Sequence, residues 1–209
     1  MYVARVLYPV EVLGPGKRVG IWTCGCPHKC DGCANPELWE VDESRNIKLS
    51  VLLDLIHRIV SNNLVDGFTI TGGEPFFQKE ELKKLLSALS AWSHDILVYT
   101  GYCKEQLCDS DLEHISVLID GPYIKEMNNG LVLRGSSNQR IHILDSRFED
   151  IYASYLSIEQ HSRIQNFLDG TSVISVGIHQ PDFAGIIGKR MEKRGLVEGG
   201  IQKDESIHP

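Results

Sequence analysis

The sequence predicts an α/β fold with parallel strands. Short apolar segments rich in β-branched residues alternate with amphipathic segments of helical spacing through most of the 209 residues, and 42% of the chain is hydrophobic, which is enough for one substantial core. Repeated strand–helix–strand units imply right-handed crossovers, which bring the carboxyl ends of the strands to one edge of the sheet. Ligands bind at that edge in such folds, so the loops after the strands are candidate sites.

The expected strands are short apolar runs bounded by turn residues. The first two lie on either side of a Gly-Pro-Gly turn, and the later ones alternate with helices. They cover residues 2–10, 18–23, 67–71, 96–100 and 116–120. Ser50 is the expected N-cap of a helix with Leu and Ile at helical spacing up to Val60. Lys79–Leu89 carries leucines on one face, and residues 104–113 are expected to form a shorter helix.

After residue 145 the sequence predicts a βα extension. We expect a strand over 171–178, a turn at 179–181, and a helix that Asp182 caps, that runs through Arg194 and that ends at Gly195. Such a unit would extend the sheet or create a new partner surface. Residues 199–209 are polar and glycine-led, and we expect them to be disordered. The chain then divides into a core of residues 1–145, an extension of residues 146–198 and a tail of residues 199–209.

Three cysteines are the most informative feature of the chain. Cys26, Cys30 and Cys33 form a Cys-x3-Cys-x2-Cys run on a loop after the second strand. Three thiolates so close together can bind one side of an inorganic centre, such as a [4Fe-4S] cluster, and leave the fourth iron without a protein ligand. Zinc is the alternative, with Cys24 or His28 as the fourth ligand. Disulfides are disfavoured because the N-terminus has no apolar leader segment.

A second signal follows the strand over residues 67–71. It is Gly72-Gly73-Glu74, where glycines let the backbone approach a ligand and a carboxylate can accept hydrogen bonds from an amine. The alternative is an ordinary strand-to-helix turn that Pro75 begins. Its position downstream of the cysteine run favours a shared site at the carboxyl ends of the strands.

These two signals resemble those of the radical S-adenosylmethionine (SAM) enzymes. Four segments narrow the resemblance to the activating proteins of anaerobic (class III) ribonucleotide reductase, and it covers about the first 145 residues. They are residues 26–33 with Asn35 and Trp39, residues 99–102, residues 117–123, and the Arg-Gly-Ser-Ser-Asn-Gln-Arg-Ile run of residues 134–141. The resemblance implies an incomplete (β/α) barrel of the radical SAM type with parallel strands.

The resemblance also implies roles for individual residues. Cys26, Cys30 and Cys33 would ligate a [4Fe-4S] cluster whose open iron binds SAM. The remaining implied SAM-binding residues are Gly32, Cys33, Ala34, Gly72, Gly73 and Glu74, with Tyr99 and Asp120 lining the pocket. Reductive cleavage of SAM would yield a 5′-deoxyadenosyl radical that abstracts a hydrogen atom from a glycine of a large protein partner. An electron donor such as flavodoxin or ferredoxin is implied. Residues 134–140 would contact the partner or cap the open barrel, and the second role is favoured because polar runs of this kind most often tie down loops.

The extension departs from that family, whose chains end soon after the Arg-Gly-Ser-Ser-Asn-Gln-Arg run. A radical SAM enzyme that modifies a different protein or peptide is therefore an alternative. A non-catalytic iron–sulfur or zinc interaction module is a further alternative of another class. We expect Cys24, Cys103 and Cys108 to be buried or incidental thiols, His28 to be a solvated loop residue and His179 to be structural.

Composition excludes other classes. The net charge is −7 with both signs mixed along the chain and no stripe of Lys or Arg, which argues against nucleic acid as a partner. No apolar run is long enough to span a membrane. Together with reduced cysteines, this predicts a cytoplasmic protein.

Overall fold

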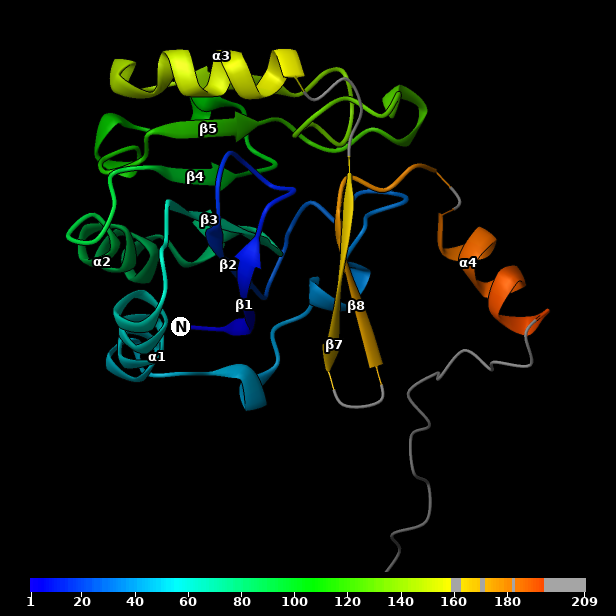
Figure 1. Cartoon of the computed structure of the whole chain (residues 1–209), viewed down its shortest axis with the longest axis horizontal. Coiled ribbons are helices and arrows are strands. Elements are labelled where there is room, and N and C mark those ends of the chain that lie inside the picture. Colours follow the sequence, from blue (N-terminus) through cyan, green and yellow to red (C-terminus); the bar gives the residue numbers. More distant parts are fainter. Residues whose placement is uncertain (159–162, 170–171, 182, 194–209) are drawn as a thin grey trace, which may run out of the picture.

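A six-stranded sheet forms the centre of the molecule (Figure 1). The structure is a computed structural model that describes residues 1–158, 163–169, 172–181 and 183–193. In sheet order the strands are β1 (Val3–Val10), β2 (Arg18–Thr23), β3 (Gly67–Gly72), β4 (Ile96–Tyr99), β5 (Val117–Asp120) and β6 (Arg140–Ile143). Strands β2 to β5 are parallel, whereas β1 and β6 pair antiparallel at the two edges.

The α/β class is confirmed, and so are the parallel central strands. The barrel is not confirmed: the sheet is open, and β1 and β6 stand at opposite ends of the strand order. The physical reason lies in the edge strands. Each joins its neighbour antiparallel, so the winding of parallel strands stops after β5 instead of continuing toward closure.

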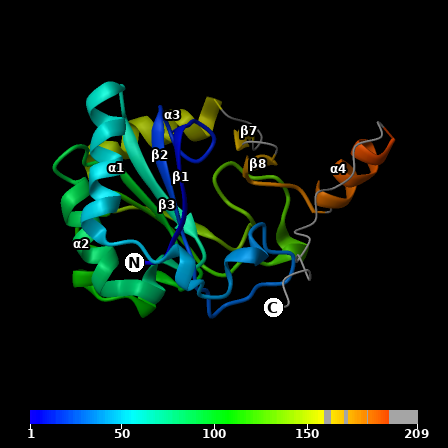
Figure 2. The same cartoon turned by 90° about the horizontal axis from the view of Figure 1, so that it is seen from below.

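Two helices cover one face of the sheet, as Figures 1 and 2 show. They are α1 (Leu49–Asn62) and α2 (Lys79–Leu89), and α2 has the predicted bounds. Their buried leucines and isoleucines pack on the sheet residues Val19, Ile21, Phe68, Ile70 and Val98. The expected N-cap at Ser50 is wrong, because α1 already begins at Leu49 and Lys48 occupies the cap position.

The helix expected over 104–113 is wrong. Two 3-10 turns, Lys104–Gln106 and Asp109–Asp111, stand in its place, and Leu107 between them is extended. Tertiary contacts outweigh local propensity here. The buried Asp111 carboxylate pairs with Lys79 and Lys83 of α2, at 2.8 and 3.0 Å, and Leu107 packs against the core.

The first three elements of the extension, a helix and a hairpin, pack on the other face of the sheet (Figure 2). Helix α3 (Glu149–Ile158), β7 (Ile164–Asp169), β8 (Ser172–Gly177) and α4 (Phe183–Glu192) follow β6. The expected strand is present as β8, but it pairs antiparallel with β7 in a separate two-stranded sheet. The sequence analysis missed β6, α3 and β7, and the expected βα unit is a helix, a hairpin and a helix. The flanks of the last helix at Asp182, Arg194 and Gly195 and the tail over 199–209 lie outside the described residues.

The amino ends of the parallel strands are closed by a buried ion pair. Arg18, the first residue of β2, is fully buried, and its guanidinium lies 2.6 Å from the Asp95 carboxylate. The guanidinium also donates to the Thr69 hydroxyl (2.7 Å) and to the Phe68 carbonyl (2.6 Å). Tyr152 of α3 donates its hydroxyl to Asp95 at 2.8 Å. These buried polar groups are therefore satisfied within the core.

Within the part of the chain that the structure describes, no helix has the length and apolar character needed to cross a membrane.

Candidate functional site

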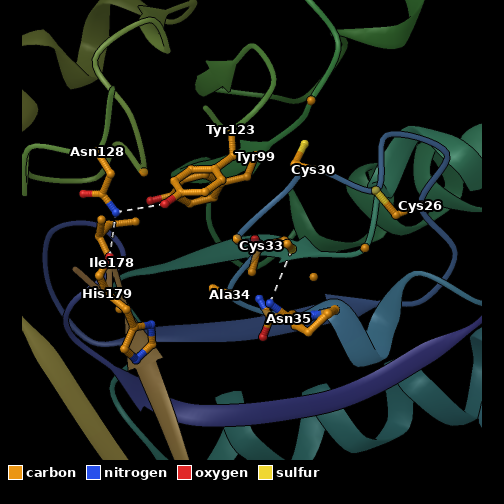
Figure 3. Close-up of a pocket in the computed structure, with 18 of the residues that line it drawn as sticks. Cys26, Cys30, Cys33, Ala34, Asn35, Tyr99, Tyr123, Asn128, Ile178 and His179 are labelled. Atoms are coloured by element: carbon orange, nitrogen blue, oxygen red, sulfur yellow. Dashed lines mark hydrogen bonds between the residues drawn. The ribbon is translucent and has the colours of Figure 1, made fainter. Parts of the chain in front are cut away.

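The opposite ends of the same strands surround one cavity of about 620 Å³ (Figure 3). The cysteine loop follows β2, Gly72 ends β3 and residues 73–74 follow it, Tyr99 ends β4, and Gly121 and Tyr123 follow β5. All contribute to the cavity wall. The convergence expected from parallel winding is confirmed.

Cys26, Cys30 and Cys33 all line this cavity and are half-buried. All six cysteines of the chain are free thiols, so disulfides are not supported. Burial raises the pKa of each cavity thiol, and a neighbouring cysteine adds to the rise in all three cases. Thiols of this kind are stabilised as thiolates by a cationic metal centre. Their chemistry and placement fit an iron–sulfur cluster.

The thiols do not form a closed coordination shell. Within residues 1–158, 163–169, 172–181 and 183–193, no three His, Cys, Asp or Glu side chains are grouped as a metal site. Cys24 does not join them, because it is buried in the apolar core, where Arg45 donates to its sulfur at 3.6 Å. His28 Nε2 lies 3.2 Å from a carboxylate oxygen of Glu74. Neither Cys24 nor His28 is therefore placed with the three thiols as a fourth ligand.

The Gly-Gly pair lets the end of β3 lie against the cysteine loop. Gly73 donates its N–H to the Thr23 carbonyl and Glu74 donates to the Gly25 carbonyl, both at 2.8 Å. A Cβ at Gly73 would lie 2.6 Å from that Gly25 oxygen, and one at Gly72, where φ is +111°, would lie 2.5 Å from the Thr23 nitrogen. Only glycine fits this close approach of two chain segments.

Glu74 lines the cavity, but its carboxylate is almost fully buried and already has protein donors. The N–H groups of Phe76 (3.0 Å) and Gly101 (2.8 Å) and the Thr100 hydroxyl (2.9 Å) donate to it. His28 Nε2 lies 3.2 Å from Glu74 Oε2. Glu74 thus ties the ends of β3 and β4 to the cysteine loop, and a ligand amine would share its oxygens. The expectation that His28 is solvated is wrong, because its side chain is only 20% exposed.

Tyr99 stands at the end of β4, among the cavity-lining residues that Figure 3 labels. Its hydroxyl is buried and has no hydrogen-bond partner among the described residues. Burial raises the pKa of Tyr99 far above its ordinary value, so the hydroxyl stays a donor. A buried polar group without a partner, on a residue that lines a cavity, is a candidate donor to a ligand. Gly32 and Ala34 also line the cavity, as the resemblance implies.

Asp120 does not line the cavity, so its expected placement is wrong. Its buried carboxylate accepts from the Lys104 N–H at 2.7 Å and pairs with Arg140 and with His142, the latter at 3.2 Å. Burial alone would raise the pKa of Asp120, but these donors outweigh it and hold the pKa below the ordinary range. Asp120 anchors the end of β5 to β6 beneath the site.

The Arg-Gly-Ser-Ser-Asn-Gln-Arg run ties down the loop after β5, as the commoner interpretation predicts. Gln139 accepts from the Gly135 N–H (2.8 Å) and donates to the Gly121 carbonyl (2.9 Å). Asn138 donates to the Pro122 carbonyl at 2.8 Å. These side chains fix the loop that carries the cavity residues Gly121 and Tyr123.

The sequence analysis missed one wall of the cavity. The extension contributes lining residues from Ser175 to Ile187, and Asn128 lies between them and the core. His179, expected to be structural, is one of the lining residues. Its Nε2 lies 2.9 Å from the Ser175 hydroxyl. No local pattern signals this wall, because it depends on how the hairpin packs against the sheet.

Comparison with known proteins gives consistent matches. A family model described as a 4Fe-4S single cluster domain matches residues 12–142. The anaerobic ribonucleoside-triphosphate reductase-activating protein of Enterobacteria phage T4 is 35% identical over 141 residues, which cover 65% of this chain and 90% of the relative. The protein of the same name from Escherichia coli strain K12 is 31% identical over 147 residues, which cover 66% and 96%. About a third of this chain has no counterpart in these alignments.

Proposed function

The chain belongs to the family of the anaerobic ribonucleoside-triphosphate reductase-activating proteins and carries a 4Fe-4S single cluster domain, and on this premise we propose that it is a radical SAM activase. Cys26, Cys30 and Cys33 ligate the cluster, and the cavity beside them binds SAM. The substrate is a large protein partner, an anaerobic ribonucleotide reductase-like enzyme, on which the reaction leaves a glycyl radical.

The single observation that carries the proposal is the shared cavity. The three thiols, Gly32 to Ala34, Gly72 to Glu74 and Tyr99 come from three strand ends, yet they line one cavity of about 620 Å³. That volume is within the range of small-molecule sites. No fourth cysteine lines the cavity among the described residues, so a cluster bound here keeps one iron open.

The residues around the thiols have distinct tasks in this proposal. The buried Glu74 carboxylate supplies negative charge beside the amino group of SAM. Gly72 and Gly73 have no side chain, so the backbone before Glu74 stays accessible to the ligand. The Tyr99 hydroxyl donates to a polar group of the ligand. Leu13 and Trp22 give part of the wall an apolar surface that excludes water.

A reduced cluster held by Cys26, Cys30 and Cys33 would supply the one electron that reductive cleavage of SAM to methionine and 5′-deoxyadenosine needs, with the hydrogen atom taken from the protein partner. Flavodoxin or ferredoxin is the electron donor in this proposal. A cytoplasmic location is part of this proposal, and the six free thiols support it, because a reducing compartment keeps cysteines unpaired.

A second candidate function keeps this chemistry but changes the target. The extension, which lies beyond residues 12–142 that the family model matches, lines the same cavity. A different protein or peptide is then the substrate. Recovery of a large glycyl-radical enzyme with the chain from an anaerobic culture favours the first function over the second.

The test is anaerobic reconstitution of the chain with iron and sulfide, followed by reduction with dithionite in the presence of SAM. We expect about four irons per chain and formation of 5′-deoxyadenosine. Cys30→Ala should abolish 5′-deoxyadenosine formation. The matched control is Cys108→Ala, because Cys108 is exposed and does not line the cavity.

Two outcomes contradict the proposal. Cleavage of SAM by Cys30→Ala at the wild-type rate would overturn the cluster assignment. Binding of iron without any binding or cleavage of SAM would favour a non-catalytic iron–sulfur module. An electron paramagnetic resonance spectrum of the partner after the reaction then tests whether the radical resides on glycine.

A further inference from the structure

The extension reaches the end of the cavity farthest from Cys26 in Figure 3, where Asn128, Ile178 and His179 lie. The proposed cluster and SAM occupy the cysteine end. The group that reacts with SAM must then approach from elsewhere in the same cavity, and the wall built by the extension is available for it.

This wall is anchored to the core at two places. At one end of the hairpin, Gln165 of β7 accepts from the Glu11 N–H (3.0 Å) and donates to the Pro9 carbonyl (2.7 Å). Val176 of β8 is 3% exposed and packs in an apolar cluster with Trp22. The wall is therefore a built part of the cavity.

Asn128 provides the second anchor. Its Nδ2 donates to the His179 carbonyl at 2.8 Å and to the Tyr123 hydroxyl at 3.1 Å, while its Oδ1 accepts from the Gly130 N–H at 3.2 Å. One amide thus joins the loop after β5 to the turn after β8 (Figure 3). Since the cavity runs between these two segments, Asn128 sets their separation.

The chemistry of the wall favours a peptide over a charged small molecule. None of its described lining side chains, from Ser175 to Ile187, carries a fixed positive charge, and Lys125, a cation of the cavity lining, comes from the loop after β5 and not from this wall. Burial lowers the pKa of His179, which favours the neutral imidazole. Among the described residues β8 pairs only with β7, so its other edge offers backbone groups to an extended chain. Val176 and Ile178 both line the cavity and can make apolar contacts with such a chain.

We propose that β8 and the turn after it form the substrate end of the cavity, where an extended peptide segment of the protein partner binds, and that Asn128 is a positioning residue for this wall. The inference rests on the proposed function, because it takes a protein as the substrate. It adds the location and the conformation of the substrate segment.

The experiment measures two affinities on the full reconstituted chain. One is for SAM. The other is for a synthetic peptide that spans the radical-bearing glycine of the anaerobic ribonucleoside-triphosphate reductase from the same genome. Asn128→Asp keeps the shape of the side chain but removes the donor to His179, and it should weaken peptide binding about tenfold, more than it weakens SAM binding. Gln165→Ala loosens the other anchor and should act in the same direction. Leu168→Ala is the control, because Leu168 is 85% exposed on the hairpin.

The outcomes separate the inference from the proposed function. Equal peptide affinity for the wild type and both anchor variants overturns the inference, as does a larger loss of SAM affinity than of peptide affinity. A reductase that acquires its radical although the peptide does not bind also overturns the inference and leaves the proposed function intact. A chain that neither cleaves SAM nor binds the peptide refutes both. A photo-crosslinker at position 178 that captures the peptide, while one at position 168 does not, supports the inference independently of activity.

Discussion

Two buried tyrosines show how differently the two ends of the parallel strands are built. At the amino ends, Tyr152 donates its hydroxyl to Asp95, which also pairs with the buried Arg18. At the carboxyl ends, the Tyr99 hydroxyl is buried and has no partner among the described residues. The amino ends hold a satisfied polar network, whereas the carboxyl ends leave a cavity and an unpaired group.

This difference indicates that the amino ends of the strands stabilise the fold, whereas the carboxyl ends leave room for a ligand. A satisfied buried network fixes the strands in place, and removal of one partner leaves the others uncompensated. An unpaired group beside a cavity destabilises the fold unless a ligand satisfies it. Substitutions at the amino ends should therefore act on folding, and those at the carboxyl ends mainly on binding.

The largest effect on stability is expected from Asp95→Ala at the amino ends. It leaves the Arg18 guanidinium buried without its carboxylate, and we expect the free energy of unfolding to fall by about 3–5 kcal/mol. Urea denaturation of the apo chain measures it. Glu40→Ala is the control, because Glu40 and its partner Lys29 are both largely exposed, and it should have little effect. A loss for Asp95→Ala as small as the control's would contradict the role of the network.

Glu74→Gln tests the carboxyl ends of the strands, where we expect an effect on ligand binding as well as on stability. The amide keeps one acceptor oxygen but turns an NH2 group toward donors that the carboxylate now accepts from, and we expect a loss of about 1–3 kcal/mol. Affinity for SAM should fall as well, because the charge beside the amine is removed. Denaturation and equilibrium dialysis measure the two effects. Glu40→Gln is the control: Glu40 is exposed and its ion-pair partner is Lys29 of the cysteine loop. Unchanged SAM affinity in Glu74→Gln would argue against a direct role of the carboxylate.

Local patterns predicted the elements whose core contacts follow a single period. The strand over 18–23 and the helix over 79–89 have the expected bounds, because each presents one continuous apolar set to the sheet. The helix predicted over residues 104–113 does not form, because long-range ion pairs from Lys79 and Lys83 hold Asp111 in a 3-10 turn. Strand β6 was missed because its four residues, Arg140–Ile143, are short and only partly buried.

For the candidate site, too, local patterns predicted some features and missed others. The spacing of the cysteines and the Gly-Gly-Glu element identified the cavity, because parallel winding brings their loops together. The strand pattern placed Asp120 at the same edge, and the resemblance implied that it lines the pocket; the structure shows its carboxylate paired with Arg140, and Asp120 is not among the lining residues. The wall from the extension depends on packing between residues more than a hundred positions apart, such as Gln165 and Pro9, which no local pattern encodes.

Asp120→Asn tests a carboxylate that supports the carboxyl ends without facing the cavity. Because its pKa in the folded chain lies below the ordinary value, Asp120 stabilises the fold above about pH 4, and this stabilisation is lost as the pH falls through the folded-state pKa. We expect Asp120→Asn to lower stability by about 1–2 kcal/mol near neutral pH, with a gap from the wild type that narrows toward about pH 3. Urea denaturation across this pH range measures it. A gap that widened on acidification would contradict the sign of the shift.

The smallest effect is expected from Tyr152→Phe, which removes only one hydrogen bond from the amino-end network. The ring stays buried in α3, and Asp95 keeps its ion pair with Arg18, so we expect a loss of about 1 kcal/mol. Ser157→Ala on an exposed position of the same helix is the control and should change little. Hydrogen exchange measures where the loss falls. If the effect reaches α3 but not β7 and β8, helix and hairpin are anchored independently, because the hairpin has its own contacts through Gln165 and Asn128. If the hairpin loosens as well, the extension behaves as one cooperative unit, and the satisfied end of the sheet then helps to hold the wall of the cavity at the other end.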